Sequence, residues 1–223
     1  MKYTLKAFFP EKKNYNDFID LLSENKIEYE YKYEFPEYLI TLDTQKGLLD
    51  KVYEDFGEYI FADEDITLID IFHDTISKTD ITISGAESCT GGLVSKYLTD
   101  RAGSSKYFKY SVVSYSNESK IKILNINKEK MEKKGVVSKA TIIGMLEGLE
   151  YIYPTNIAYA VTGIAGPTGG TKEQPIGTVF IGIVQYGRRE IQAYQFEGSR
   201  WEIRRYSTWT ILLKMLNKIK NDL

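Results

Sequence analysis

The sequence contains one cysteine, Cys89, and one histidine, His73, among its 223 residues. A single cysteine excludes disulfide bonds within the chain and is typical of a reducing compartment. With one histidine, neither a histidine-rich metal site nor a Ser-His-Asp triad is well supplied. We therefore expect no bound metal, and a catalytic serine would need a base other than histidine.

Long apolar runs and an excess of basic charge are also missing. No apolar run approaches the roughly 20 residues that span a bilayer, and the N-terminus lacks the apolar core of a signal peptide. The formal net charge is -2, so the chain lacks the excess of basic residues that binds nucleic acid or an anionic membrane through bulk electrostatics. We expect a cytoplasmic protein that contacts neither.

The pattern of apolar residues predicts two domains. Over residues 1–62 the elements follow the order β-α-β-β-α-β, typical of a small α+β unit with a split βαβ, ferredoxin-like arrangement. The acidic residues 63–65 have the composition of a linker. Over residues 66–223 strands and helices alternate, and the last two strands form an antiparallel hairpin. This pattern indicates a three-layer α/β domain with a mixed sheet.

Residues 85–92 read Gly-Ala-Glu-Ser-Cys-Thr-Gly-Gly, between a predicted strand and a predicted helix. Hydroxyls and unpaired backbone N–H groups at a helix N-terminus suit an anion such as a phosphate, and glycines let the backbone approach it closely. In the alternative interpretation, Ser88 or Thr90 only caps the helix.

Ser105, Tyr115 and Lys120 supply the groups that activate a serine without histidine. A serine hydroxyl is essentially un-ionised at neutral pH, so it needs Lys, or Tyr whose pKa a neighbouring Lys lowers. Alternatively, Ser105 caps a turn, Tyr115 packs in the core and Lys120 faces solvent. Glu87 is a general base, a partner that orients Lys120, or a structural hydrogen-bonding group.

A glycine-rich loop, residues 162–170, follows another predicted strand, and Arg200 lies near the start of the last predicted helix. The loop lacks the Gly-Lys-Ser/Thr of a Walker motif, so nucleotide hydrolysis is not indicated. Either its N–H groups donate to an oxyanion or a phosphate, or it is a mobile surface loop.

Either Arg200 holds a phosphate or carboxylate, or it lies on a solvated helix face. Ligands of open α/β sheets bind at the carboxyl ends of strands, where we expect the site.

Six motifs follow one another along the chain: Ala86-Glu-Ser-Cys-Thr-Gly-Gly92, Ala102-Gly-Ser-Ser105, Tyr115-Ser-Asn-Glu-Ser-Lys120, Gly135-Val-Val-Ser138, Val161-Thr-Gly-Ile-Ala-Gly-Pro167 and Pro175-Ile-Gly-Thr-Val179. In this order they closely resemble the C-terminal domain of the CinA family (competence/damage-inducible protein), also known as the PncC-type nicotinamide-nucleotide amidohydrolase. The resemblance implies hydrolysis of nicotinamide mononucleotide to nicotinate mononucleotide and ammonia in pyridine-nucleotide salvage. It also implies no redox cofactor and a homodimer or higher homo-oligomer.

The same resemblance gives the motifs roles. Ser105 matches the family serine that acts on the carboxamide, with Tyr115 and Lys120 as its activating partners. Ser88 matches the second serine of the family site, and the choice of nucleophile between Ser105 and Ser88 stays open. The other matched positions are implied to bind the substrate: Glu87, Thr90, Gly91, Thr162, Gly163, Gly166 and Arg200.

Arg200 matches the arginine of the family's Gly-Asp-Arg motif, which is implied to meet the substrate phosphate. Here the motif reads Gly198-Ser199-Arg200, so the acidic neighbour is missing. This departure favours the alternative function, a catalytically inactive nucleotide-binding sensor or a competence-associated scaffold.

Residues 1–62 are similar, more weakly, to the KH-type middle domain of CinA proteins. The similar stretches are 35–38, 47–49 and 59–62. The chain has no room for the molybdopterin-binding-like domain of full-length CinA proteins, so we expect the pyrophosphatase activity associated with it to be absent. These residues are acidic and lack a Gly-x-x-Gly clamp, so we expect no RNA binding.

Overall fold

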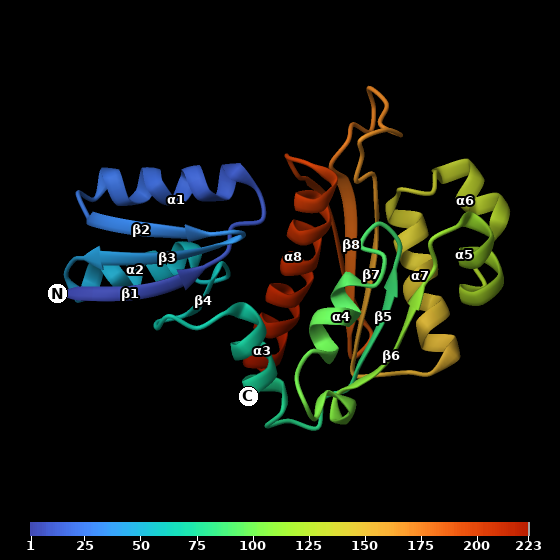
Figure 1. Cartoon of the computed structure of the whole chain (residues 1–223), viewed down its shortest axis with the longest axis horizontal. Helices are drawn as coiled ribbons and strands as arrows, with labels where there is room; N and C mark the ends of the chain where they lie inside the picture. Colours follow the sequence, from blue (N-terminus) through green and yellow to red (C-terminus); the bar gives the residue numbers. More distant parts are fainter. Residues whose placement is uncertain (223) are drawn as a thin grey trace. The chain divides into compact units, whose positions relative to one another are not determined.

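The computed structural model describes residues 1–222 and divides into two compact units, one over Met1–Phe72 and one from His73 onward (Figure 1). Helix α3 (Leu68–Ile76) crosses the boundary between them. Among the described residues, no helix combines the length and the apolar character needed to cross a membrane.

The first unit is a four-stranded antiparallel sheet with two helices. Its elements are β1 (Lys2–Ala7), α1 (Lys12–Glu24), β2 (Glu28–Glu34), β3 (Glu37–Asp43), α2 (Lys46–Phe56) and β4 (Ile60–Ala62). The strands lie in the order β2-β3-β1-β4, so β3 separates β1 from β2, the two strands that α1 connects. This split βαβ arrangement is the one that the sequence predicted.

Strand alternation gives this sheet an apolar face. Leu5 of β1 and Ile40 of β3 pair in register and are buried together with Leu42. From α1, Phe18 and Leu22 lie four residues apart, on one side of the helix, and join the same core.

The opposite face of the sheet holds a buried charge, the ammonium of Lys6. Its Nζ lies 2.9 Å from Asp65 Oδ1 and 3.9 Å from Glu37 Oε2. Glu37 Oε1 also accepts a hydrogen bond of 3.1 Å from the backbone N–H of Leu68, in the first turn of α3. Because a buried ammonium needs such partners, the segment around Asp65 is held to the sheet.

The second unit is an α/β structure. Its elements are β5 (Ile83–Glu87), α4 (Leu93–Thr99), the 3-10 helix η1 (Ser104–Lys106), β6 (Phe108–Val113), α5 (Asn117–Leu124), α6 (Lys128–Lys134), α7 (Lys139–Ile152), β7 (Ile157–Gly163), β8 (Thr178–Gln185), β9 (Arg188–Gln195) and α8 (Arg200–Asn221). The strands lie in the order β6-β5-β7-β8-β9, with β6, β5 and β7 parallel and β8 and β9 antiparallel to their neighbours. The mixed sheet and the final hairpin confirm the predicted α/β fold.

Helices cover both faces of the mixed sheet and make it the middle of three layers (Figure 1). Helix α7 packs on one face against β7 and β8, with α5 and α6 beside it, while α8 packs on the other face next to α4. Helix α6 is absent from the sequence prediction. Its residues are charged except for Met131, which is buried, so no apolar periodicity reveals it.

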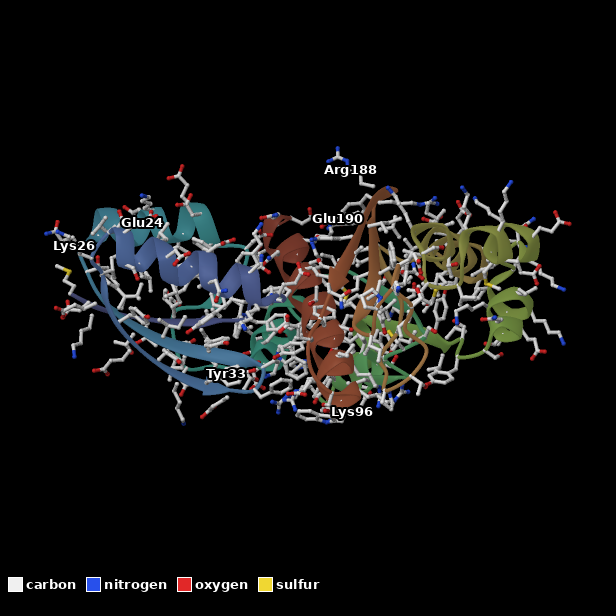
Figure 2. The ribbon with its side chains drawn as sticks, turned by 90° about the horizontal axis from the view of Figure 1, so that it is seen from above. Glu24, Lys26, Tyr33, Lys96, Arg188 and Glu190 are labelled. Carbon is white, nitrogen blue, oxygen red and sulfur yellow. The ribbon has the colours of Figure 1, made fainter. Side chains whose placement is uncertain are left out.

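Charge pairs join the final hairpin to α8. Glu190 of β9 lies beside α8, whereas Arg188 projects from the β8–β9 turn (Figure 2). The Glu190 carboxylate lies 2.5 Å from Lys214 Nζ and 3.0 Å from Lys218 Nζ. Partial burial acts to raise the pKa of Glu190, but hydrogen bonds from the two lysines hold it below its usual value.

Gly85 lies in the centre of the sheet because the ring of Tyr159 occupies the place of a side chain. A Cβ on Gly85 would lie 2.1 Å from Tyr159 Cζ and 2.4 Å from its hydroxyl oxygen. The two residues pair in register across β5 and β7, and Tyr159 donates a hydrogen bond of 3.1 Å to Glu87 Oε1. The glycine thus makes room for the tyrosine to reach Glu87.

We expect Gly85→Ala to lower the free energy of unfolding by about 2–3 kcal/mol, because a methyl group there overpacks the core against a fixed ring. Gly47→Ala is the control: a Cβ there meets nothing within 4 Å, and alanine in a helix gains about 0.5–1 kcal/mol over glycine. Urea denaturation followed by circular dichroism measures both. A Gly85→Ala protein as stable as the parent would contradict the packing described.

Candidate active site

The carboxyl ends of β5, β6 and β7 lie side by side. Glu87 ends β5 and pairs with Val113 of β6 and with Val161 of β7. The segments that follow these strands carry three of the motifs singled out in the sequence. As predicted, the motifs meet at the edge where open α/β sheets bind ligands.

The Glu87 carboxylate is completely buried at the N-terminus of α4. Oε2 accepts hydrogen bonds from Thr90 Oγ1 at 2.7 Å and from the backbone N–H groups of Gly92 and Val94 at 2.9 and 3.2 Å. Oε1 accepts from the N–H and hydroxyl of Ser95 at 2.8 and 2.6 Å, in addition to the Tyr159 hydroxyl. The chain therefore supplies its own anion to this helix N-terminus.

This arrangement bears on the two interpretations of the segment. In one of them the start of α4 receives a substrate anion, but in the structure the N–H groups of Gly92 and Val94 bond to Glu87. Thr90, implied as a substrate contact, is buried and directs its hydroxyl to the same carboxylate. Of the roles considered for Glu87, the structure forms the structural hydrogen-bonding one.

Ser88 and Lys120 form a buried pair on the other side of the segment. Lys120 Nζ lies 2.9 Å from Ser88 Oγ and 2.7 Å from the carbonyl oxygen of Ser114. Lys120 is completely buried, and Ser88 is 8% exposed. Lys120 lies in the first turns of α5, and Ser116 is the N-cap of that helix. Because the helix begins there, its fourth residue, Lys120, lies close to the end of β5.

Burial lowers the pKa of Lys120 to about 8, and the thiol of Cys89 opposes this only in part. A lysine with this pKa is about one-tenth neutral at pH 7 and mostly neutral at pH 9. The neutral amine accepts a proton. Lys120 can therefore act as a base near neutral pH, as a histidine could.

A cavity of about 210 Å³ opens onto this pair. Its lining comes from five segments of the second unit: Ser88, Cys89, Tyr115, Asn117, Lys120, Val136, Val137, Thr162, Gly163, Ala165 and Arg200. The site residues Ser88, Tyr115, Lys120, Thr162 and Arg200, which the sequence singled out, therefore meet in one place.

Tyr115 and Arg200 form the outer part of the cavity. Tyr115 is 58% exposed, and its hydroxyl accepts a hydrogen bond of 2.6 Å from Arg200 Nη2. Arg200 Nη1 donates to the carbonyl oxygen of Gly166 at 2.9 Å. Tyr115 therefore bonds to the arginine rather than to Ser88 or Lys120 in the described structure.

The glycine-rich loop reaches the cavity through Thr162 and Gly163. Thr162 is buried, and its hydroxyl donates to the carbonyl of Val136 at 3.3 Å. A Cβ on Gly163 would lie 2.7 Å from Val179 Cγ2, so only glycine fits beside β8. Gly166 meets the cavity indirectly, through its bond to Arg200.

Ser105 lies at the other end of the sheet. It belongs to η1, which precedes β6, and Phe108 at the start of β6 pairs with Ile83 at the start of β5. The length of β5, about 15 Å, therefore separates Ser105 from Ser88. The predicted grouping of Ser105 with Tyr115 and Lys120 is not formed, because Ser105 and Tyr115 flank opposite ends of one strand.

Five cavity residues were not named as site residues from the sequence: Cys89, Asn117, Val136, Val137 and Ala165. Most are apolar or small, and they lie inside the motifs without a chemical signal of their own. Burial raises the pKa of Cys89 to about 12, which keeps its thiol un-ionised and inert at neutral pH. In residues 1–222, no three His, Cys, Asp or Glu side chains are grouped to hold a metal ion.

Ser199 anchors the start of α8 in place of an acidic residue. Its hydroxyl accepts a hydrogen bond from the backbone N–H of Glu202 at 3.4 Å, and its own N–H donates to Glu202 Oε2 at 2.7 Å. This is a capping box, and serine and aspartate are about equally good N-caps. Although serine replaces the aspartate of the Gly-Asp-Arg motif, the helix that carries Arg200 is still capped.

The second unit is a three-layer α/β domain with a mixed sheet, and a buried serine–lysine pair lies at the carboxyl ends of its parallel strands. Residues 65–219 match the family model of the CinA C-terminal domain. The chain belongs to the CinA family, through that C-terminal domain.

Relatives agree with this membership. A CinA-like protein of Fervidobacterium nodosum is 43% identical over 152 residues, which are 68% of this chain and 37% of that protein. A CinA-like protein of Dictyoglomus thermophilum is 41% identical over 172 residues, 75% of this chain and 42% of that protein. The chain thus spans less than half the length of these relatives.

Solved structures show the same fold. The competence/damage inducible protein CihA of Agrobacterium tumefaciens is 36% identical, with a TM-score of 0.62 over 69% of this chain and 93% of that chain. A CinA superfamily protein of Klebsiella pneumoniae is 27% identical, with a TM-score of 0.65 over 69% of this chain and 96% of that chain.

We expect Glu87→Gln to lower the free energy of unfolding by about 2–4 kcal/mol, because an amide NH₂ would replace an acceptor among donors. The matched control is Glu202→Gln, where glutamine also completes a capping box and the cost stays under about 0.5 kcal/mol. Urea unfolding measures both. Equal stabilities of the two variants would show that the carboxylate network does not hold the segment.

Proposed function

We propose that the second unit is an amidohydrolase, with Ser88 as its nucleophile and Lys120 as its general base. The observation that carries this proposal is the distance of 2.9 Å between Ser88 Oγ and the buried Lys120 Nζ. This distance is within reach of direct proton transfer, and burial lowers the pKa of the lysine to about 8.

Each step of the hydrolysis follows from this pair. Neutral Lys120 takes the proton of Ser88 as Oγ attacks the carboxamide carbon, and the protonated lysine then gives that proton to the departing ammonia. The acyl ester on Ser88 is hydrolysed by a water molecule that Lys120 deprotonates in the same way. The sum is amide plus water to acid plus ammonia. The backbone along Gly163 and Ala165 lines the same cavity and is our candidate for the oxyanion donors.

We propose nicotinamide mononucleotide as the substrate, from the family resemblance together with Arg200. In the described part of the chain, the Arg200 guanidinium bonds to a carbonyl and a phenol, both neutral, and forms no ion pair. A cation at a cavity without a carboxylate partner suits a phosphate monoester. The homodimer and the cytoplasmic location implied earlier remain predictions.

Substitution of the two serines tests the nucleophile. With nicotinamide mononucleotide and a chelator present, we expect Ser88→Ala to lower kcat by about a thousandfold or more. Ser105→Ala is the control and should stay within about threefold of the parent, since Ser105 lies at the far end of the sheet. Ammonia and nicotinate mononucleotide are measured. Loss of turnover in Ser105→Ala alone would refute our assignment, and a parent that binds the nucleotide without turnover would be a sensor.

The pH profile tests the base. Because only the neutral form of Lys120 accepts a proton, kcat/KM should rise about tenfold per unit below pH 8 and level off above it. Lys120→Met should be inactive at every pH, since methionine fills the space without a base. Activity that falls as the pH rises from 6 to 8 would exclude Lys120 as the base.

A further inference from the structure

A second arginine of α8, Arg204, holds the segment that contains Ser88. Arg204 lies four residues after Arg200, one turn further along the helix. Its Nη2 and Nε atoms donate hydrogen bonds of 2.6 and 3.2 Å to the same atom, the carbonyl oxygen of Thr90. Both donors of one edge of the guanidinium are therefore directed to the backbone two residues beyond Ser88.

Two opposite charges hold the two sides of Thr90. The Thr90 hydroxyl bonds inward to the Glu87 carboxylate at 2.7 Å, while its carbonyl bonds outward to Arg204. Bonds with an ionised partner are about twice as strong as those between neutral groups. The backbone N–H of Ser88 donates to the carbonyl of Val161 at 3.0 Å and fixes the start of the segment on β7.

The backbone beside this contact turns at Gly91 and lies against the guanidinium. Gly91 has a φ of 60°, in the left-handed region that favours glycine. The nearest neighbour of a Cβ placed there would be Arg204 Nη2, at 3.4 Å. Arg204 forms no ion pair among the described residues, so its charge is directed to the segment rather than to an acidic partner.

We propose that Arg204 is a positioning residue that keeps Ser88 Oγ within reach of Lys120 Nζ. The proposal rests on the function proposed above. Arg204 does not line the cavity, so it acts through the Thr90 carbonyl and not by contact with substrate. Because a misplacement of about 1 Å costs on the order of a hundredfold in rate, loosening the segment affects kcat more than KM.

Cys89 provides a readout that does not depend on turnover. It is the only cysteine of the chain, lies next to Ser88 and is 6% exposed. Its buried thiol reacts slowly with 5,5′-dithiobis(2-nitrobenzoate) while the segment is held, so an increase in the labelling rate over that of the parent under native conditions measures a loosening of the segment. The yellow product of the exchange is followed by absorbance.

The experiment compares four proteins: the parent, Arg204→Met, Arg204→Lys and Arg205→Met. Arg204→Met keeps an unbranched, largely apolar stem and removes both donors, so we expect Cys89 labelling at least about tenfold faster, with kcat about 10–100-fold lower and KM within about threefold. Arg204→Lys keeps the charge but not the two-donor edge, and should lie between parent and Arg204→Met.

Arg205→Met is the matched control. Arg205 is the next residue of α8, and its guanidinium lies over the ring of Trp209, 4.5 Å from the centroid. We expect Arg205→Met to label at the parent's rate once urea unfolding has corrected for any change in global stability. Equal acceleration in the two methionine variants would show a general loosening of α8 and would overturn the proposal.

The outcomes separate the two proposals. Labelling of Arg204→Met within twofold of the parent overturns the role of Arg204, whatever the activity. Faster labelling with unchanged kcat shows that Arg204 holds the segment but does not position Ser88, and also overturns the proposal. A parent without turnover refutes the proposed function, while faster labelling specific to Arg204→Met still supports the hold of Arg204 on the segment.

Discussion

The buried carboxylate of Glu87 is the interaction on which the site depends. A carboxylate removed from water is stable only when donors replace the water, and here the first turn of α4, Thr90 and Tyr159 supply six. The same bonds satisfy N–H groups that a helix N-terminus leaves open. Strand β5, helix α4 and strand β7 are thereby joined at one point, and the segment that carries Ser88 begins there.

Two consecutive residues, Glu87 and Ser88, have different roles: Glu87 stabilises the structure, and Ser88 belongs to the proposed reactive pair. Glu87 bonds toward α4, and Ser88, the next residue, bonds to Lys120 of α5 on the other face of the sheet. Burial of Lys120 lowers its pKa from 10.5 to about 8, which costs the folded state about 3 kcal/mol at neutral pH. The cost is complete below pH 8 and disappears as the pH rises to 10.5. The hydrogen bonds of Glu87 stabilise the fold and offset the free energy that the buried Lys120 costs.

Much of the site could be predicted because several motifs lie at strand ends and, taken in order, resemble those of the CinA family. Ser88, Tyr115, Lys120, Thr162 and Arg200 were all named from the sequence, and all line one cavity. The grouping of Ser105 with Tyr115 and Lys120 rested on the chemistry of these side chains and on the family resemblance. The structure does not form it, because a strand lies between Ser105 and Tyr115 and carries its two ends apart.

The sequence by itself determined the order of elements except for α6, the mixed sheet and the edge where the motifs gather, because these follow from local periodicity and from the rule for ligand sites in α/β sheets. Only the tertiary structure decided which groups meet. It directed the Glu87 carboxylate to α4, buried Lys120 under Ser88 and placed Arg204 against the Thr90 carbonyl. Such contacts join residues up to 114 positions apart. Their geometry depends on packing, which no local pattern records.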